Sequence, residues 1–405
     1  MTTTTSSLDR RYDLDWIRVG AFSLLILYHV GMFYVPWDWH VKTPHPVEAI
    51  GPLMQLTNPW RLTLLFLVSG AATRFMADKV TVGKLTGARI ARLLPPLVFA
   101  MFVIVPPQSY YEIIEAAAAS PTAGIVVDPY GAFWMKYATA SGNWCDADGC
   151  LITPTWNHMW FVAYLLVYSL ILALMLAFFP KLGAKLQGGL ERALKGPGLL
   201  LWPIAFLALT RMFLMPRFEI THALTDDWYT HAVSRPAFLR GFGLAKSERL
   251  RERLIGMRWT ALVLAVVCWA GWATYAWIYR AEDANPPLAL RLFMRCVYSV
   301  DQWCAIAAIL GFGARHLNRD APVLRYLTLA VFPFYIVHQT LIVVLAHHLA
   351  KLGLPQGLEA AILIVATFAG CFATYEVVRR IPVVCWLFGL KSQPRAEASR
   401  PPVLA

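Results

Sequence analysis

Long apolar runs recur along the whole chain and are separated by short polar segments. Each run has about 20 residues, the length that an α-helix needs to cross a hydrocarbon core of about 30 Å. The pattern predicts ten transmembrane helices, at residues 14–36, 57–76, 89–107, 157–179, 198–215, 228–245, 258–279, 291–313, 326–349 and 357–378. We therefore expect an all-α integral membrane protein, a bundle of about ten transmembrane helices.

The same pattern predicts one transmembrane domain, residues 14–391, between short tails at 1–13 and 392–405. The first thirteen residues carry no apolar run, and the first apolar segment is too long for a cleaved signal peptide. The most polar helix, 228–245, contains His231, Arg235 and Arg240. Such a helix must be shielded from lipid if it spans the membrane.

Composition and charge fix the expected topology. Hydrophobic residues make up 58% of the chain, charged residues 15%, and the mean hydropathy is +0.53, which excludes an ordinary soluble enzyme. A net charge of +12 is typical of nucleic-acid-binding proteins, but basic residues also collect where the loops of a membrane protein face the cytoplasm. With the N-terminus inside, 24 Lys and Arg lie on the cytoplasmic side and five outside, so we predict cytoplasmic termini and no nucleic-acid partner.

One long loop, 108–156, is predicted on the outer side, and it contains Cys145 and Cys150. An outer loop of a bacterial inner membrane is an oxidising setting, which favours a disulfide. The alternative is a metal site that uses Asp146 and Asp148, but no His lies nearby. The other five cysteines are typical of small apolar packing residues.

The first predicted helix contains the ionisable residues Arg18 and His29. Eleven residues are three helical turns plus about 20°, so these side chains share one face, about 16 Å apart along the axis. His40 follows after eleven more residues, beyond Pro36. Arg18 alone fits an anchor at the inner headgroups, whereas an imidazole inside the membrane favours a general base over a structural hydrogen bond.

Arg89 and Arg92 stand three residues apart at the cytoplasmic start of the third predicted helix. Two guanidinium groups on one helix face can clamp the phosphates of a nucleotide-bearing donor such as coenzyme A. Anchoring under the positive-inside rule explains the pair equally well on this pattern alone.

Two further candidate site residues lie in the last two predicted helices. His338 is midway along the ninth, with Tyr335 three residues earlier on the same face, and either contacts substrate or makes a structural hydrogen bond. Glu376 lies near the cytoplasmic end of the tenth, where it can line a channel or pair with Arg379.

Aromatic and histidine residues gather at the predicted outer helix ends. The set comprises Trp37, Trp39, His40, Trp144, Trp156, His158 and Trp160. An aromatic belt explains part of it, and flat rings mixed with His and Asp also suit sugar binding.

Taken together in this order, these motifs resemble the acyltransferase 3 family of membrane acyltransferases. The resemblance rests on Arg18 and His29 with ten residues between them, FLVSG at 66–70, the Arg89 and Arg92 pair, HMWF at 158–161 and FYIVH at 334–338. It extends from about residue 12 to 391. Within the family the chain is most similar to the glucans biosynthesis protein C branch, which puts succinyl groups on osmoregulated periplasmic glucans, through DWHV at 38–41 and YEVVRRIPVVCWLFGLK at 375–391.

The resemblance implies an acyl-coenzyme A donor from the cytoplasm, a carbohydrate acceptor outside, and no permanently bound cofactor. It implies that His29 is the catalytic base with Arg18 as its same-face partner, and that Arg89 and Arg92 bind the donor. His40, Trp39, His158, Trp160, Tyr335, His338 and Glu376 are then expected to line the acceptor site or a channel. Gln339 stands where the family pattern has a second His, which leaves the acyl or acceptor specificity open.

The mechanism expected from these roles is attack of an acceptor hydroxyl on the thioester while His29 removes its proton, without a metal. An acyl-His29 intermediate is an alternative route. A succinyl donor needs a cation for its free carboxylate, and Arg211, Arg235, Arg240, Arg291 and Arg295 are all available. The rival class is a transporter of a sugar or lipid conjugate, with Arg18, His29 and His338 along its path.

Overall fold

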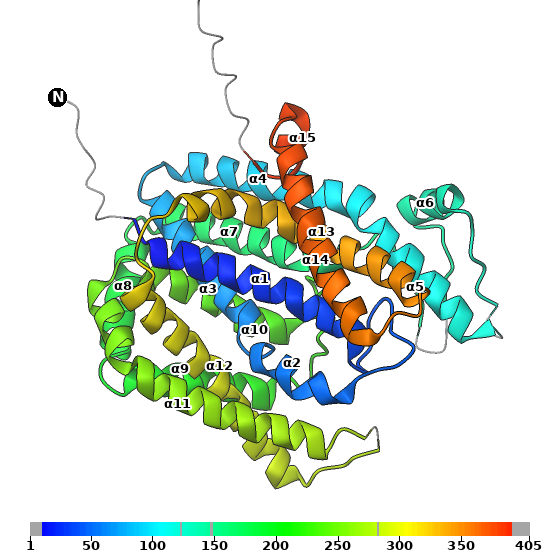
Figure 1. Cartoon of the computed structure of the whole chain (residues 1–405). Helices are drawn as coiled ribbons and strands as arrows, with labels where there is room; N and C mark the ends of the chain where they lie inside the picture. Colours follow the sequence, from blue (N-terminus) through cyan, green and yellow to red (C-terminus); the bar gives the residue numbers. More distant parts are fainter. Residues whose placement is uncertain (1–9, 122–123, 146–148, 282, 391–405) are drawn as a thin grey trace, which may run out of the picture.

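The computed structural model describes residues 10–121, 124–145, 149–281 and 283–390, and every regular element in these ranges is a helix. The all-α class is therefore confirmed (Figure 1). The predicted tail 392–405 and most of the tail 1–13 lie outside these ranges. The longer helices are α1 (Tyr12–Tyr34), α3 (Arg61–Ala77), α4 (Val82–Phe99), α5 (Pro106–Ala119), α7 (Trp160–Phe178), α9 (Gly198–Phe213), α10 (Trp228–Leu244), α11 (Glu248–Ile278), α12 (Leu288–His316), α13 (Pro322–Ala350) and α14 (Gln356–Val378). The shorter ones are α2 (Gly51–Thr57), α6 (Tyr130–Ala138), α8 (Leu182–Ala193) and α15 (Pro382–Leu387).

A helix occupies each of the ten ranges predicted to span the membrane. By length and composition, seven spans among the described residues are able to cross a membrane, and an eighth is counted if the bent pair α8 and α9 is one span. The chain is thus a multi-pass membrane protein. Ten spans remain a prediction, because α3 and α10 have only 17 residues each.

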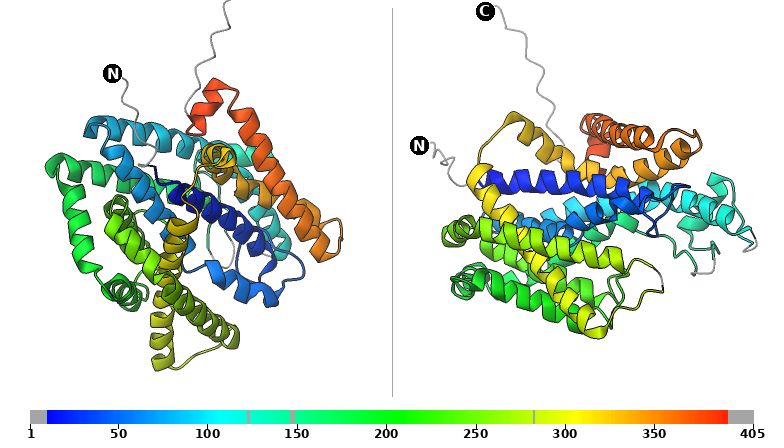
Figure 2. Two further views of the ribbon diagram at one scale, coloured as in Figure 1. Left: turned by 60° about the vertical axis from the view of Figure 1, so that its left-hand side comes forward. Right: turned by 60° about the horizontal axis from the view of Figure 1, so that its bottom comes forward.

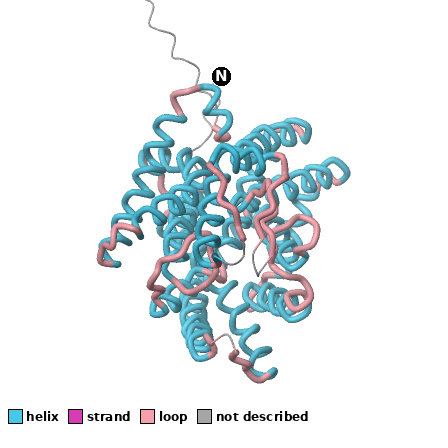
Figure 3. Tube along the Cα trace, turned by 90° about the vertical axis from the view of Figure 1, so that its right-hand side faces the viewer, coloured by secondary structure: helices cyan, strands magenta, loops and turns pink. Residues whose placement is uncertain are grey.

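Helix α1 packs against α3, α12 and α13. Figure 1 shows α11 and α12 below α1, α13 above it and α14 to its right, and Figure 2 shows the same bundle from two other directions. We call the end of the bundle where α1 begins the N-side, and the end where α1 stops the loop side. Figure 3 looks onto the loop side, where several long loops gather. These two ends matter because the side chains of α1 face a cavity at each of them.

The polar helix α10 packs along α3, at a distance that only glycine permits. A Cβ atom added at Gly241 would lie 1.8 Å from the carbonyl oxygen of Leu67, and one added at Gly70 would lie 1.8 Å from the carbonyl oxygen of Phe238. Tyr168 and the carbonyl of Leu224 hydrogen-bond the His231 ring. Protein contacts therefore take up both ring nitrogens of His231.

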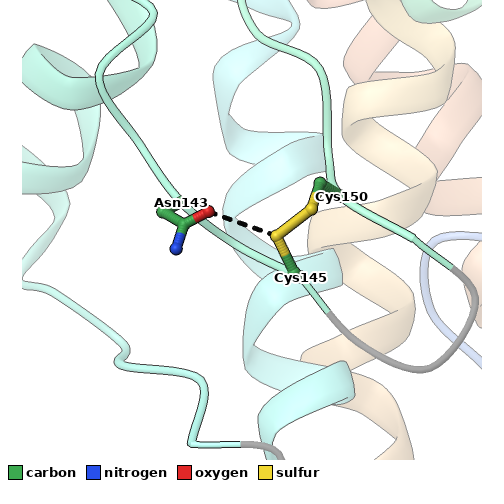
Figure 4. Close-up of a disulfide and its surroundings, with 3 residues drawn as sticks. All are labelled: Asn143, Cys145 and Cys150. Atoms are coloured by element: carbon green, nitrogen blue, oxygen red, sulfur yellow. Dashed lines mark hydrogen bonds between the residues drawn. A yellow bond between two sulfur atoms is a disulfide. The ribbon is translucent and has the colours of Figure 1, made fainter.

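The predicted loop 108–156 contains two helices, α5 and α6, and a small second core of Ile113, Phe133, Tyr137 and Trp144. The π-helical segment Ala100–Ile104 connects α4 to α5. Cys145 and Cys150 form the predicted disulfide on the loop side, with Asn143 beside it (Figure 4). Asp146 and Asp148 of the alternative metal site lie outside the described residues.

Candidate functional site

Helix α1 places Arg18 and His29 at two separate cavities. Arg18 lines a cavity of about 560 Å³ on the N-side, which we call the basic cavity. His29 lines a second cavity of about 560 Å³ toward the loop side, which we call the histidine cavity. The eleven-residue spacing of Arg18 and His29 therefore places these two side chains at two different sites.

The basic cavity gathers three arginine side chains from two helices. Arg18, Arg89 and Arg92 line it, and no carboxylate does among the residues that the structure describes. Asp15 holds Arg18 from outside the cavity, with 3.3 Å between Nη2 and Oδ1. Arg89 is 9% exposed and donates a hydrogen bond to Oγ1 of Thr73. Arg89 and Arg92 form no ion pair among the described residues, and such guanidinium groups beside apolar walls are suited to a phosphate-bearing ligand.

In the histidine cavity, hydrogen bonds assign the tautomer of His29. The Nδ1–H of His338 donates to the carbonyl oxygen of Tyr335 at 2.7 Å, because a carbonyl can only accept. In the neutral ring, Nε2 of His338 must then accept, and it lies 2.8 Å from Nδ1 of His29. His29 consequently carries its proton on Nδ1. Its Nε2 is left with a free lone pair and has no partner within the described ranges.

The two imidazole rings are held nearly parallel, at 6° between their planes and 5.0 Å between centroids. His338 is fully buried behind His29, with the ring of His158 edge-on to it at 5.2 Å. His338 therefore orients His29 and does not line the cavity. This arrangement fixes the ring of His29 and leaves its Nε2 free, which is what a general base at this position would require.

A second chain of hydrogen bonds fixes the wall of the histidine cavity. Nε2 of Gln339 donates to Nε2 of His40 at 2.9 Å and to Oε1 of Gln108 at 3.1 Å. Gln108 in turn donates to Nδ1 of His158 at 3.2 Å. Nδ1 of His40 donates to Glu112 at 2.6 Å. Gln339 thus links two histidines of the wall, a role that needs an amide donor at this position.

An aromatic partition separates the two cavities. Phe161 lines both of them, Phe22 lines the basic cavity and Tyr335 lines the histidine cavity. Their ring centroids lie 5.3 Å apart for Phe22 and Tyr335, and 6.0 Å apart for Phe161 and Tyr335. These packed rings thus lie between the two cavities.

An open, acidic cleft of about 470 Å³ adjoins the histidine cavity on the loop side, and the two share Asp38, Trp39 and His40. Glu112, Glu115 and Trp144 also line the cleft. Lys42 in this cleft donates to the carbonyl oxygen of Met32 at 2.6 Å, and burial lowers the pKa of its amine to about 8. Carboxylates beside indole rings suit a polyhydroxylated ligand.

The remaining predicted residues divide between the cavity and the surface. Trp39, His40, His158, Trp160 and Tyr335 all line the histidine cavity, together with His29.

Glu376 lies elsewhere, paired with Arg379 at 2.8 Å and accepting a hydrogen bond from Tyr326 at 2.7 Å.

Sequence reasoning missed Arg61, Asn58 and Gln108. Arg61 was detectable as an ionisable residue inside a predicted membrane helix. Asn58 and Gln108 are polar residues at predicted helix ends and carry no such signal.

Comparison with known proteins identifies one family. The family model described as acyltransferase domain matches residues 11–376. Among curated proteins, glucans biosynthesis protein C of Escherichia coli O1:K1 / APEC is 22% identical over 409 residues, which cover 97% of this chain and 98% of that protein. The same protein of Escherichia coli O9:H4 (strain HS) and of Escherichia coli strain SE11 matches to the same extent. No solved structure matches the chain significantly.

Proposed function

The chain belongs to the acyltransferase 3 family of membrane acyltransferases, and from this premise we propose that it moves an acyl group from cytoplasmic acyl-coenzyme A to a hydroxyl of an extracytoplasmic carbohydrate. The observation that carries the proposal is the free Nε2 of His29, fixed by the bond from Nδ1 to His338 and turned to a cavity. A transporter path does not require a base with an assigned tautomer.

The proposed orientation puts the N-side in the cytoplasm of a bacterial cell and the loop side outside its inner membrane. The excess of Lys and Arg on N-side segments supports it, because such residues favour the cytoplasm. The disulfide on the loop side supports it as well, since disulfides persist outside the cytoplasm.

The proposed donor site is the basic cavity. Arg18, Arg89 and Arg92 would bind the phosphates of coenzyme A, and Phe332 and Trp386 line the same cavity as flat surfaces for the purine ring. The acyl-bearing arm would then pass the rings of Phe22 and Phe161 to bring the thioester to His29. In this proposal Arg18 acts on the donor rather than on the reacting carbonyl.

The proposed chemistry is direct acyl transfer. Nε2 of His29 takes the proton of the acceptor hydroxyl as its oxygen attacks the thioester carbonyl carbon. The carbon–sulfur bond then breaks, and the leaving thiolate of coenzyme A takes the proton back from His29. This proton transfer restores the starting tautomer of His29, so the reaction as written needs no metal and no redox partner.

The proposed acceptor enters from the acidic cleft, past Asp38 and Trp39, toward His29. The name of the curated relatives, glucans biosynthesis protein C, supports a glucan as the acceptor and periplasmic glucan as the first one to test. The resemblance of the chain to that branch supports succinyl, with acetyl as the other acyl group to compare.

The test is release of free coenzyme A by the purified protein from succinyl- and acetyl-coenzyme A, with and without periplasmic glucan. We expect glucan-dependent release that falls by at least about 100-fold in His29→Ala. His45→Ala is the matched control, because His45 is exposed on the loop side. Full transfer by a folded His29→Ala protein would refute the role of His29 as the general base. Transport of a glycoconjugate without thioester cleavage would instead favour the transporter.

A further inference from the structure

The histidine cavity contains a buried cation that the proposed proton transfer does not use. Arg61 is the first residue of α3, is 4% exposed and lines this cavity together with His29. None of the five arginines considered from the sequence as partners for a succinyl carboxylate lines it. The structure therefore draws attention to an arginine that the sequence pattern did not.

Neutral groups hold the Arg61 side chain in place. Its guanidinium carbon lies 3.3 Å from the centroid of the Tyr28 ring, and Nη1 donates to Oδ1 of Asn58 at 3.3 Å. Tyr28 donates to the same Asn58 oxygen at 3.3 Å. Two neutral side chains, Tyr28 and Asn58, thus orient the guanidinium without neutralising it.

No carboxylate pairs with Arg61 within the described part of the chain, and its Nε has no hydrogen-bond partner. Asp38 lines the same cavity but forms no ion pair with it. The N-terminus of α3 adds positive potential here, because Arg61 and Leu62 of its first turn both border the cavity. A buried, uncompensated charge is costly, so the site is built to receive an anion.

The position of Arg61 relative to the base suggests which anion. Tyr28, on which the guanidinium stacks, precedes His29 in α1, and the two rings lie 6.2 Å apart between centroids. A carboxylate bound at Arg61 is therefore close to the reacting carbonyl without being the reacting group. A succinyl group has this form, since two methylenes separate its thioester carbonyl from its free carboxylate.

We infer that Arg61 and the first turn of α3 form a subsite for the free carboxylate of a dicarboxylic acyl group, of which succinyl is the first to test. The inference rests on the proposed function, since it assigns the acyl group of that reaction. The subsite selects the acyl chain by charge, and His29 acts on its other end.

The first test is binding, which does not depend on turnover. Succinyl-coenzyme A and butyryl-coenzyme A have acyl chains of equal length, and only the first ends in a carboxylate. We expect calorimetry to show that the wild-type protein in nanodiscs binds succinyl-coenzyme A at least about tenfold more tightly than butyryl-coenzyme A. Arg61→Gln should abolish this difference, and Arg61→Lys should restore part of it. Equal affinities in the wild type would overturn the inference.

The second test is transfer. In Arg61→Gln we expect kcat/KM for succinyl-coenzyme A to fall by about 100-fold, and that for acetyl-coenzyme A to change by less than about threefold. Arg211→Gln is the matched control, because Arg211 is buried to a similar extent but does not line the cavity. An equal loss of kcat/KM with both donors would indicate that Arg61 stabilises the transition state, and it would overturn the proposed carboxylate subsite. A binding preference without transfer by any donor would refute the proposed function alone.

Discussion

The hydrogen bond from Nδ1 of His29 to His338 leads to a prediction about a residue that does not line the histidine cavity. In His338→Leu nothing accepts from Nδ1 of His29, so the ring loses its fixed tautomer and orientation. We expect kcat to fall by at least about 100-fold with little change in KM for the donor. The measurement is steady-state release of coenzyme A by the purified variant.

His338→Gln is the control for this prediction, because an amide oxygen can accept the same hydrogen bond. It should retain clearly more activity than His338→Leu at the same thermal stability. Two variants that lose activity equally, with unchanged melting, would indicate that His338 does not act through the tautomer of His29.

At the residue scale, the sequence predicted which side chains share a face of one helix, but not which residues of other helices they contact. The eleven-residue spacing placed Arg18 and His29 on one face, since helical geometry is local. The contact of His29 with His338 depends on how α1 and α13 pack, which no spacing within either helix contains. Arg61 was overlooked because an arginine in the first turn of a membrane helix is typical of an interfacial anchor.

The crossing of α3 and α10 depends on two glycines, which makes it sensitive to one methyl group. In Gly241→Ala the new Cβ would meet the carbonyl oxygen of Leu67, so the helices must separate. We expect a loss of about 1–3 kcal/mol, visible as a lower melting temperature in detergent. Gly256→Ala on α11 is the control, since a Cβ there meets nothing within 4 Å and alanine favours a helix. Equal melting of the two variants would contradict the predicted clash.

At the scale of elements, apolar length predicted where helices lie better than where they end. The range 258–279 became α11, which begins at Glu248, because its basic first turns extend the helix beyond the apolar run. Pro106 and Pro107 start α5 rather than ending a helix, as proline is accepted in a first turn. The amphipathic α8 and the short α6 went undetected, since neither contains an apolar run of spanning length.

The molecule as a whole places an arginine-lined cavity and a histidine-lined cavity on opposite sides of one aromatic partition. Phe161 borders both, so the partition is one side chain thick at that point. Under the proposed function, this partition would keep a cytoplasmic donor and an outer acceptor apart until both are bound. It would also limit access of outside water to a thioester in the basic cavity.

Opposite access to the two cavities can be tested with single cysteines. Ser69 lines the basic cavity, and Asp38 lines the histidine cavity and the acidic cleft. In a background where the five cysteines outside the disulfide are replaced by alanine, a membrane-impermeant maleimide should label Asp38→Cys only from outside the cell. It should label Ser69→Cys only in inverted vesicles.

Coenzyme A should slow the labelling of Ser69→Cys and leave that of Asp38→Cys unchanged, because the partition separates the two positions. Labelling of both from one side would contradict the proposed orientation, and equal protection of both would contradict the partition.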